Sequence, residues 1–255
     1  MPLDLLEYSL PIPTPPGSFY GPCSGHDLRI ALQLFGSTID HFVFCDLAYT
    51  SSRTTAVNPD DSRAFAYTGH VPHGWSLVSR VRGADEMQPS KQTWYNGNRL
   101  FRPFVTYEVW RRADGSRVQI ELRADLAQDV LVDQFASGSI SAFMHVNDGT
   151  GEGGSDAWFL RGTDRSHHTE IAQTKNGSAA DVARGGFLFE HLAPRLADGA
   201  VVITDCALAD QRFSAQRPFL AEGRSWLPMG KVFRDGMRGR QVQAWRASSG
   251  PISAA

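Results

Sequence analysis

Polar residues collect at four points of the sequence, each directly after a short apolar stretch. These clusters are Gly21–Asp27, Cys45–Asp46, His145–Asp148 and Thr204–Cys206. If the apolar stretches are neighbouring parallel strands, their carboxyl ends meet at one edge of the sheet, where ligands bind in open α/β sheets. The sequence therefore predicts one shared site, and this prediction does not depend on the identity of the ligand.

The first cluster contains the turn Gly21–Gly25. Its two glycines let a ligand approach the backbone, and the helix expected from His26 directs its positive end toward the turn. Asp46 follows about 20 residues later, at the tip of the next strand, where a ribose-binding acid is found in dinucleotide-binding units. This arrangement predicts a nucleoside-type ligand. The alternative is a tight strand–helix turn, with Asp46 capping a later element.

The loop after His145 is the second candidate. Asp148, Glu152 and Asp156 supply carboxylates that could hold a cation or act as bases, and His145 could exchange protons near neutral pH. The loop contains no lysine or arginine, which speaks against a phosphate site. The alternative is that its glycines only form a mobile lid.

The three cysteines, Cys23, Cys45 and Cys206, all lie in these clusters. Converging thiolates could bind zinc, but buried thiols at strand ends are commoner and there is no C-x-x-C pair, so no metal is assigned. An odd number of distant cysteines makes no disulfide framework, and Met1–Leu10 lacks the pattern of a signal peptide. With no apolar run of membrane-spanning length, we expect a cytoplasmic protein without membrane contact.

The elements that position these clusters can be expected from the hydrophobic pattern. A strand through Phe19–Tyr20, a helix over His26–Phe35 and a strand from His41 make a βαβ unit. Further strands are expected at Trp75–Val81, Ser139–Val146 and Ala200–Ile203, helices at Asp125–Phe135 and Phe187–Leu196, and antiparallel pairs at Phe104–Trp110 with Arg117–Leu122 and at Ser225–Phe233 with Gln241–Arg246.

These elements predict an α/β protein, a three-layer sandwich with a mostly parallel central sheet and an antiparallel hairpin near the C-terminus. Residues 1–17 form an extended proline-rich lead-in, and residues 18–255 form one domain with an irregular insertion at about 50–100. The net charge of −2 and the lack of long basic runs argue against an extended nucleic-acid surface. A small molecule is the expected partner.

Several stretches resemble the Rossmann-like superfamily of S-adenosylmethionine-dependent methyltransferases, and more narrowly a bacterial branch with this core. They are FYGPCSGHD at Phe19–Asp27, HFVFCD at His41–Asp46, FMHVNDGTGEGGS at Phe143–Ser155 and DGAVVITD at Asp198–Asp205. The chain departs from the family pattern at Tyr20, where an acid is usual, and at Cys23, where a second glycine is common.

The resemblance implies a Rossmann-like fold, S-adenosylmethionine as cofactor and methyl transfer to a small molecule or a protein. Gly21, Ser24 and Gly25 would then face the cofactor and Asp46 its ribose, while Asp148 and Glu152 would lie near the transferred group. Two alternatives remain open: a non-catalytic metabolite-binding or partner-binding protein of the same fold, and a metal-assisted hydrolase that uses His145, Asp148, Glu152 and the strand-end cysteines.

Overall fold

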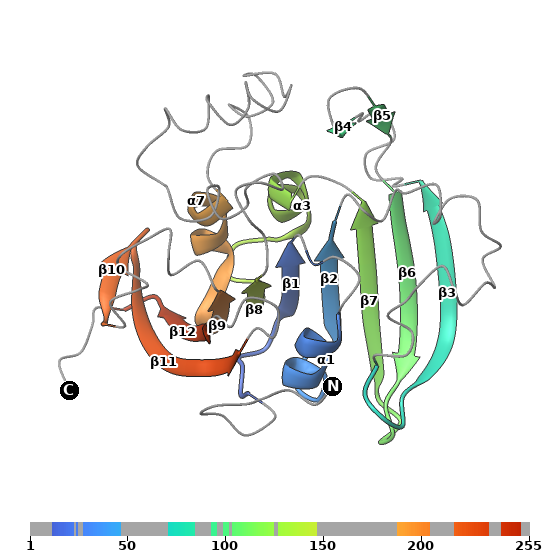
Figure 1. The fold of residues 1–255 in the computed structure, drawn as a ribbon, viewed down its shortest axis with the longest axis horizontal. Coiled ribbons are helices and arrows are strands. Elements are labelled where there is room, and N and C mark those ends of the chain that lie inside the picture. Colours follow the sequence, from blue (N-terminus) through green and yellow to red (C-terminus); the bar gives the residue numbers. More distant parts are fainter. Residues whose placement is uncertain are drawn as a thin grey trace.

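A ten-stranded mixed sheet is the main feature of the computed structural model (Figure 1). The structure describes residues 12–22, 24, 28–46, 71–84, 93–95, 99–101, 104–124, 127–146, 188–204, 217–234 and 241–250. The strands lie in the order β10-β11-β12-β9-β8-β1-β2-β7-β6-β3, and β4 (Thr93–Tyr95) and β5 (Arg99–Phe101) form a separate antiparallel pair.

Five neighbouring strands at the centre of the sheet are parallel. They are β9 (Leu196–Thr204), β8 (Ile140–His145), β1 (Ser18–Pro22), β2 (His41–Cys45) and β7 (Arg117–Ala124). β1, β2 and β8 are almost entirely buried, which explains why their sequences are nearly continuous apolar runs. In Figure 1 their arrows point to the same side of the molecule, so their carboxyl ends share one edge.

Antiparallel strands extend the sheet on both sides. One side adds β6 (Phe104–Arg111) and β3 (Ser76–Ala84), and the other adds β12 (Gln241–Ser248), β11 (Arg224–Arg234) and β10 (Phe219–Ala221). The expected hairpins at both places are confirmed as β6–β7 and β11–β12. The expected strand at Trp75–Val81 is confirmed as β3, which joins the main sheet beside β6.

The predicted α/β Rossmann-like three-layer sandwich with a mostly parallel sheet is wrong. Only four of the nine pairings in the main sheet are parallel, and the helices of the described part are few and short. α1 (Arg29–Phe35), α3 (Ala127–Gln134) and α7 (Leu188–Leu192) have seven, eight and five residues. Among the described residues between β2 and β7, the chain forms strands, since Phe104–Arg111 is rich in β-branched and aromatic side chains.

The helices pack on opposite faces of the sheet. α1 buries Ala31, Leu32 and Phe35 against a core that contains the rings of Phe19 and Phe42; we call this side the α1 face. The other side, called the α3/α7 face, contains Tyr20 and Val43 from the same two strands, together with Leu131 of α3 and Leu192 of α7. Alternating residues of each central strand therefore enter two separate cores.

Arginine side chains fix the ends of these short helices. Arg112, in the β6–β7 turn, donates to the carbonyl of Gly36 after α1 over 2.7 Å and to the carbonyl of Ile39 over 2.5 Å. Arg195, in the 3₁₀ turn Ala193–Arg195, donates to the carbonyls of Phe135 and His191. These contacts satisfy carbonyl groups near helix ends, which a short helix leaves without partners of its own.

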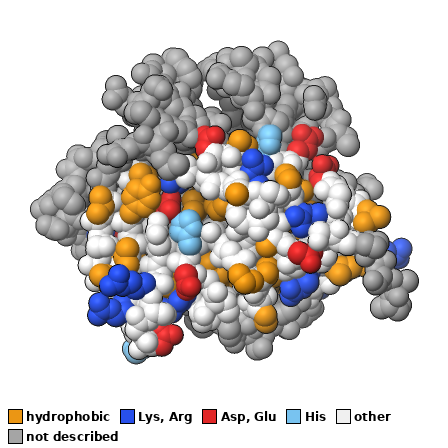
Figure 2. Space-filling model, turned by 180° about the vertical axis from the view of Figure 1, so that it is seen from behind, with side chains coloured by type: hydrophobic (Ala, Val, Ile, Leu, Met, Phe, Trp, Pro, Cys, Tyr) orange, Lys and Arg blue, Asp and Glu red, His pale blue; other side chains and the backbone are white. Residues whose placement is uncertain are grey.

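The surface of the described part carries mixed charge. The back view in Figure 2 shows positive and negative side chains interspersed among hydrophobic and uncharged ones. Among the described residues, no helix is long and apolar enough to cross a membrane. Residues 12–17, the described part of the expected lead-in, form neither helix nor strand, and Ile12 is buried against the α1 face.

Candidate functional site

The four segments expected to carry the shared site do lie side by side and run in the same direction. Their order is β9-β8-β1-β2, and β7 adds a fifth parallel strand beyond β2. Thr204 is opposite His145, Pro22 is opposite Cys45, and Cys45 is opposite Arg123. The four polar clusters, some of them more than 100 residues apart in the sequence, thus begin at one edge of the sheet.

The chain changes direction across the sheet at β1. From β1 it passes α1 on one face to reach β2, while from β8 it passes α7 on the other face to reach β9. Since the connections of β1 and β8 leave toward opposite faces, the carboxyl ends of these two neighbours form a topological switch point. Ligands bind in the crevice outside such a point in open sheets.

Ser24 and Asp46 are held together at this edge. The backbone nitrogen of Ser24 donates to the carbonyl of Cys45 over 3.3 Å, and its hydroxyl reaches the same oxygen over 3.5 Å. The backbone nitrogen of Asp46 donates to the carbonyl of Arg123 over 3.0 Å. Both residues are half-buried, so the turn after β1 and the acid after β2 form a fixed unit that solvent can reach.

Gly21 has a structural reason to be glycine. A β-carbon at this position would come within 2.9 Å of the ring of Phe19 and 3.1 Å of the ring of Phe44. Close packing on the α1 face therefore explains the missing side chain without a ligand. Its role toward a cofactor stays a prediction that concerns its backbone only.

The remaining predicted site residues divide into two groups. His145 is at the end of β8, beside Thr204, and its side chain has no exposed surface. Gly25, Asp148 and Glu152 lie outside the described residues, so their predicted roles stay predictions. Cys45 is buried, and within the described ranges no group of three or more His, Cys, Asp or Glu side chains is arranged to hold a metal ion.

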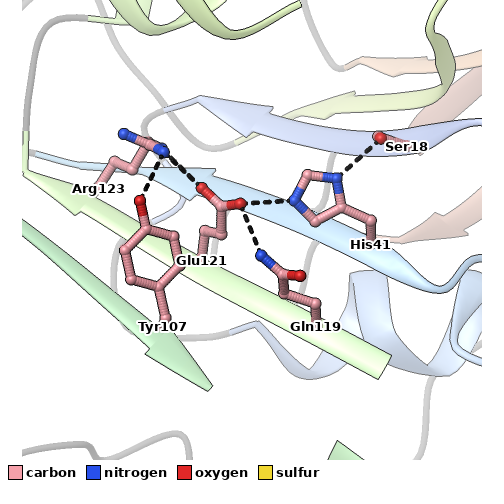
Figure 3. Close-up of polar contacts among 6 residues, drawn as sticks. All are labelled: Ser18, His41, Tyr107, Gln119, Glu121 and Arg123. Carbon is pink, nitrogen blue, oxygen red and sulfur yellow. Dashed lines mark hydrogen bonds and ion pairs between the residues drawn. The ribbon is translucent and has the colours of Figure 1, made fainter. Parts of the chain in front are cut away.

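A second polar cluster, which sequence reasoning missed, crosses the α3/α7 face of β1, β2, β7 and β6 (Figure 3). The hydroxyl of Ser18 lies 2.9 Å from Nδ1 of His41, and Nε2 of His41 lies 2.7 Å from Oε1 of Glu121. Arg123 donates to Oε2 of Glu121 through Nε over 2.9 Å and Nη2 over 2.6 Å. We call these residues the Ser18–Arg123 chain.

Two further side chains form hydrogen bonds with the Ser18–Arg123 chain. The amide of Gln119 donates to Oε1 of Glu121 over 3.0 Å, and Arg123 donates to the hydroxyl of Tyr107 over 3.3 Å. The guanidinium also lies 5.9 Å from the centre of the Tyr107 ring, within the range of a cation–π contact. Both oxygens of Glu121 are therefore engaged by donors.

The side chains of the Ser18–Arg123 chain differ sharply in burial. The side chains of Glu121 and Arg123 are 8% and 3% exposed, whereas that of His41 is 37% exposed. Burial alone would raise the pKa of Glu121, but the hydrogen bond from His41 and the positive charge of Arg123 outweigh it and lower this pKa below its ordinary value. Glu121 is accordingly a buried carboxylate that stays ionised at neutral pH.

A sequence signal for this cluster exists in β7. Its residues alternate between apolar Val118, Ile120 and Leu122 and polar Gln119, Glu121 and Arg123. In a strand with both faces in the protein, such alternation places three polar side chains in a row on one face. The partner, His41, is the one polar residue of the run HFVFC.

Comparison with models of known protein families gave no match for this sequence, and comparison with curated proteins found no relative.

Proposed function

We propose that the carboxyl edge of the five parallel strands binds a small nucleoside-type ligand, with S-adenosylmethionine as the expected one, and that the protein is a methyltransferase-like enzyme. The observation that carries this proposal is the switch point at β1, with Ser24 and Asp46 held together beside it. The ligand class follows from Asp46 at the tip of β2, because a carboxylate there can accept hydrogen bonds from the two hydroxyl groups of a ribose.

The residues of this edge fit such a ligand. Asp46 is half-buried, and its backbone nitrogen donates to the carbonyl of Arg123, so little backbone freedom is lost when its carboxylate accepts hydrogen bonds. The hydroxyl of Ser24 is on the adjacent turn. In the proposed reaction S-adenosylmethionine supplies the methyl group, and His145, Asp148 and Glu152 on β8 and after it remain the candidates for holding or deprotonating the acceptor.

The protein's main task in this reaction is alignment. Methyl transfer requires the acceptor, the methyl carbon and the sulfur to lie in line, and a base is needed only for acceptors that must lose a proton. Strands β1, β2 and β8 form a rigid base for this purpose, since their residues are almost all buried. The same edge would serve a non-catalytic binder, which would hold the ligand without turnover.

The charge at the tip of β2 gives the first prediction. We expect S-adenosylmethionine to bind the wild-type protein in isothermal titration calorimetry, and Asp46→Asn to weaken binding about tenfold or more. A hydrogen bond to a charged group contributes about 1.5–3 kcal/mol, and a factor of ten corresponds to about 1.4 kcal/mol.

Asp40→Asn is the matched control, because Asp40 precedes the opposite end of β2 and its side chain is 77% exposed. It should bind as the wild type does. No heat with wild-type protein at millimolar ligand, or equal affinity of both aspartate variants, would argue against the proposed site.

A further inference from the structure

The exposed end of the Ser18–Arg123 chain has the arrangement of an activated nucleophile. We propose that Ser18 is a reactive hydroxyl, with His41 as its general base and Glu121 as a positioning residue, and that this second site accepts acyl groups from small esters. The nucleophile and its base are joined by the 2.9 Å contact between Ser18 and His41, and the base and its orienting group by the 2.7 Å contact between His41 and Glu121.

The hydrogen-bond partners determine which nitrogen of His41 carries the proton. An ionised carboxylate can only accept, so Glu121 requires the hydrogen of a neutral imidazole on Nε2. The lone pair of Nδ1 then faces the hydroxyl of Ser18, which donates to it. Arg123 holds Glu121 in this orientation through its other oxygen, Oε2, and Gln119 donates to Oε1 beside His41.

Ser18 itself is held in place by its backbone. Its nitrogen donates to the carbonyl of Ser139 over 2.9 Å, and its carbonyl accepts from the hydroxyl of Ser141 over 3.2 Å. The pairing of β1 with β8 shifts register at Ser18, and such an irregularity redirects a side chain. Gly17 precedes Ser18 and has a φ of +146°. A β-carbon at position 17 would lie 2.7 Å from the backbone oxygen of Ser139, so the backbone before Ser18 requires glycine.

The site reaches the surface at His41 and is separate from the carboxyl edge. Ser18 is half-buried and His41 is 37% exposed, in contrast to the buried Glu121 and Arg123 behind them. Ser18 and His41 are the first residues of β1 and β2. At about 3.3 Å per residue they are about 13 Å from the carboxyl ends of these strands. The proposal for Ser18 can therefore be wrong while the proposal for the carboxyl edge holds, and the reverse is also true.

The reaction follows from these positions. As the Oγ of Ser18 bonds to the acyl carbon, the hydroxyl proton passes to Nδ1 of His41, and the bond from the acyl carbon to the alcohol oxygen breaks. The departing alkoxide takes the proton from His41. Water then attacks the acyl carbon and gives a proton to His41. The bond from the acyl carbon to Oγ of Ser18 breaks, Oγ takes the proton from His41, and the carboxylic acid leaves.

A fluorophosphonate probe tests the nucleophile directly in the full-length protein. Oγ of Ser18 forms a bond to phosphorus, the phosphorus–fluorine bond breaks, and fluoride leaves with the proton from His41. Peptide mass spectrometry then locates the adduct. Ser139 is the internal control, since it is also half-buried and close to Ser18, but its hydroxyl donates to the carbonyl of Ala136 instead of an imidazole.

We expect the adduct on Ser18 and a rate at Ser18 at least 100-fold above that at Ser139, because a positioned base contributes about 10²–10⁴-fold. His41→Ala should lower this ratio about 100-fold, and Glu121→Gln should lower it as well. A ratio within one protein does not respond to a change in overall stability. Labelling of Ser18 no faster than of Ser139, or an unchanged ratio in folded His41→Ala, would overturn the proposal. The wild-type adduct map decides the question even if a variant does not fold.

Discussion

Replacing Arg123 by methionine is expected to lower the free energy of unfolding by about 3–5 kcal/mol at pH 7, the cost of breaking a buried ion pair by removing one partner. Arg123 donates twice to Oε2 of Glu121, and both side chains are less than one tenth exposed. Methionine keeps much of the volume but removes both hydrogen bonds to Oε2 of the carboxylate, while those from His41 and Gln119 to Oε1 remain. Urea denaturation followed by circular dichroism measures the loss.

The dependence on pH distinguishes this cause from a simple packing defect. The pKa of Glu121 is lowered in the folded protein, so its contribution is present above the unfolded value of about 4.5 and is lost as pH falls through the folded pKa. In Arg123→Met, one of the two interactions that offset burial is lost, so the pKa of Glu121 rises and its carboxyl group is protonated at a higher pH. The difference between wild type and variant should therefore shrink as the pH approaches 4.

The double variant Glu121→Gln with Arg123→Met is the control. It removes the buried charge together with its partner, and it should be clearly more stable than Arg123→Met alone. A loss below about 1 kcal/mol in the single variant, or a loss that does not change with pH, would show that Glu121 does not depend on this pair.

Phe19→Ala is expected to destabilise the protein by about 3–5 kcal/mol, as deletion of a buried ring does elsewhere. Phe19 is completely buried on the α1 face, and its ring centre lies 5.7, 5.2 and 5.2 Å from those of Phe35, Phe42 and Phe44. The cavity would open between β1, β2 and α1, where strands cannot move closer without breaking their pairing.

Thermal and urea unfolding of Phe19→Ala measure this effect. Val81→Ala is the comparison, because Val81 is 63% exposed on the edge strand β3, and its truncation should cost less than about 0.5 kcal/mol. Equal losses in the two variants would mean that the ring cluster around Phe19 is not the centre of the core.

The local pattern of the sequence predicts most of the strands because buried strands and tight turns leave strong signals. HFVFC is apolar on both faces and becomes β2, and Ala113–Gly115 becomes the turn between β6 and β7, with Gly115 at φ of +88° and Asp114 accepting from Ser116. The segments beginning near Phe19, Phe42 and Ile140 also share a direction, as expected.

The fold class could not be predicted in the same way because pairing between distant strands has no local signature. The hairpin Phe104–Leu122 is easily recognised, but nothing in it indicates that β7 extends the parallel core beside β2. The helix expected over Phe187–Leu196 is shorter, and Asp198–Gly199, expected to end it, lies inside β9. The paired backbone of the sheet overrides their weak strand preference.

The Ser18–Arg123 chain was missed for a related reason. Ser18, His41 and Glu121 are separated by up to 103 residues, and the polar alternation of β7 does not indicate its partners. Only the register of β1, β2 and β7 brings the three residues together. The acid at Asp46, by contrast, follows a strand end, and the position of a residue at a strand end can be read from its neighbours.

The claim on which the proposed function depends is that the carboxyl ends of β1 and β2 are the ligand site. Amide hydrogen exchange with and without S-adenosylmethionine tests it most directly, residue by residue. We expect slower exchange at the amides of Ser24 and Asp46, which already donate to the carbonyls of Cys45 and Arg123, and no change in the distant pair β10–β11. Unchanged exchange at both amides with millimolar ligand, or slowing confined to β10–β11, would show that the ligand does not bind at this edge.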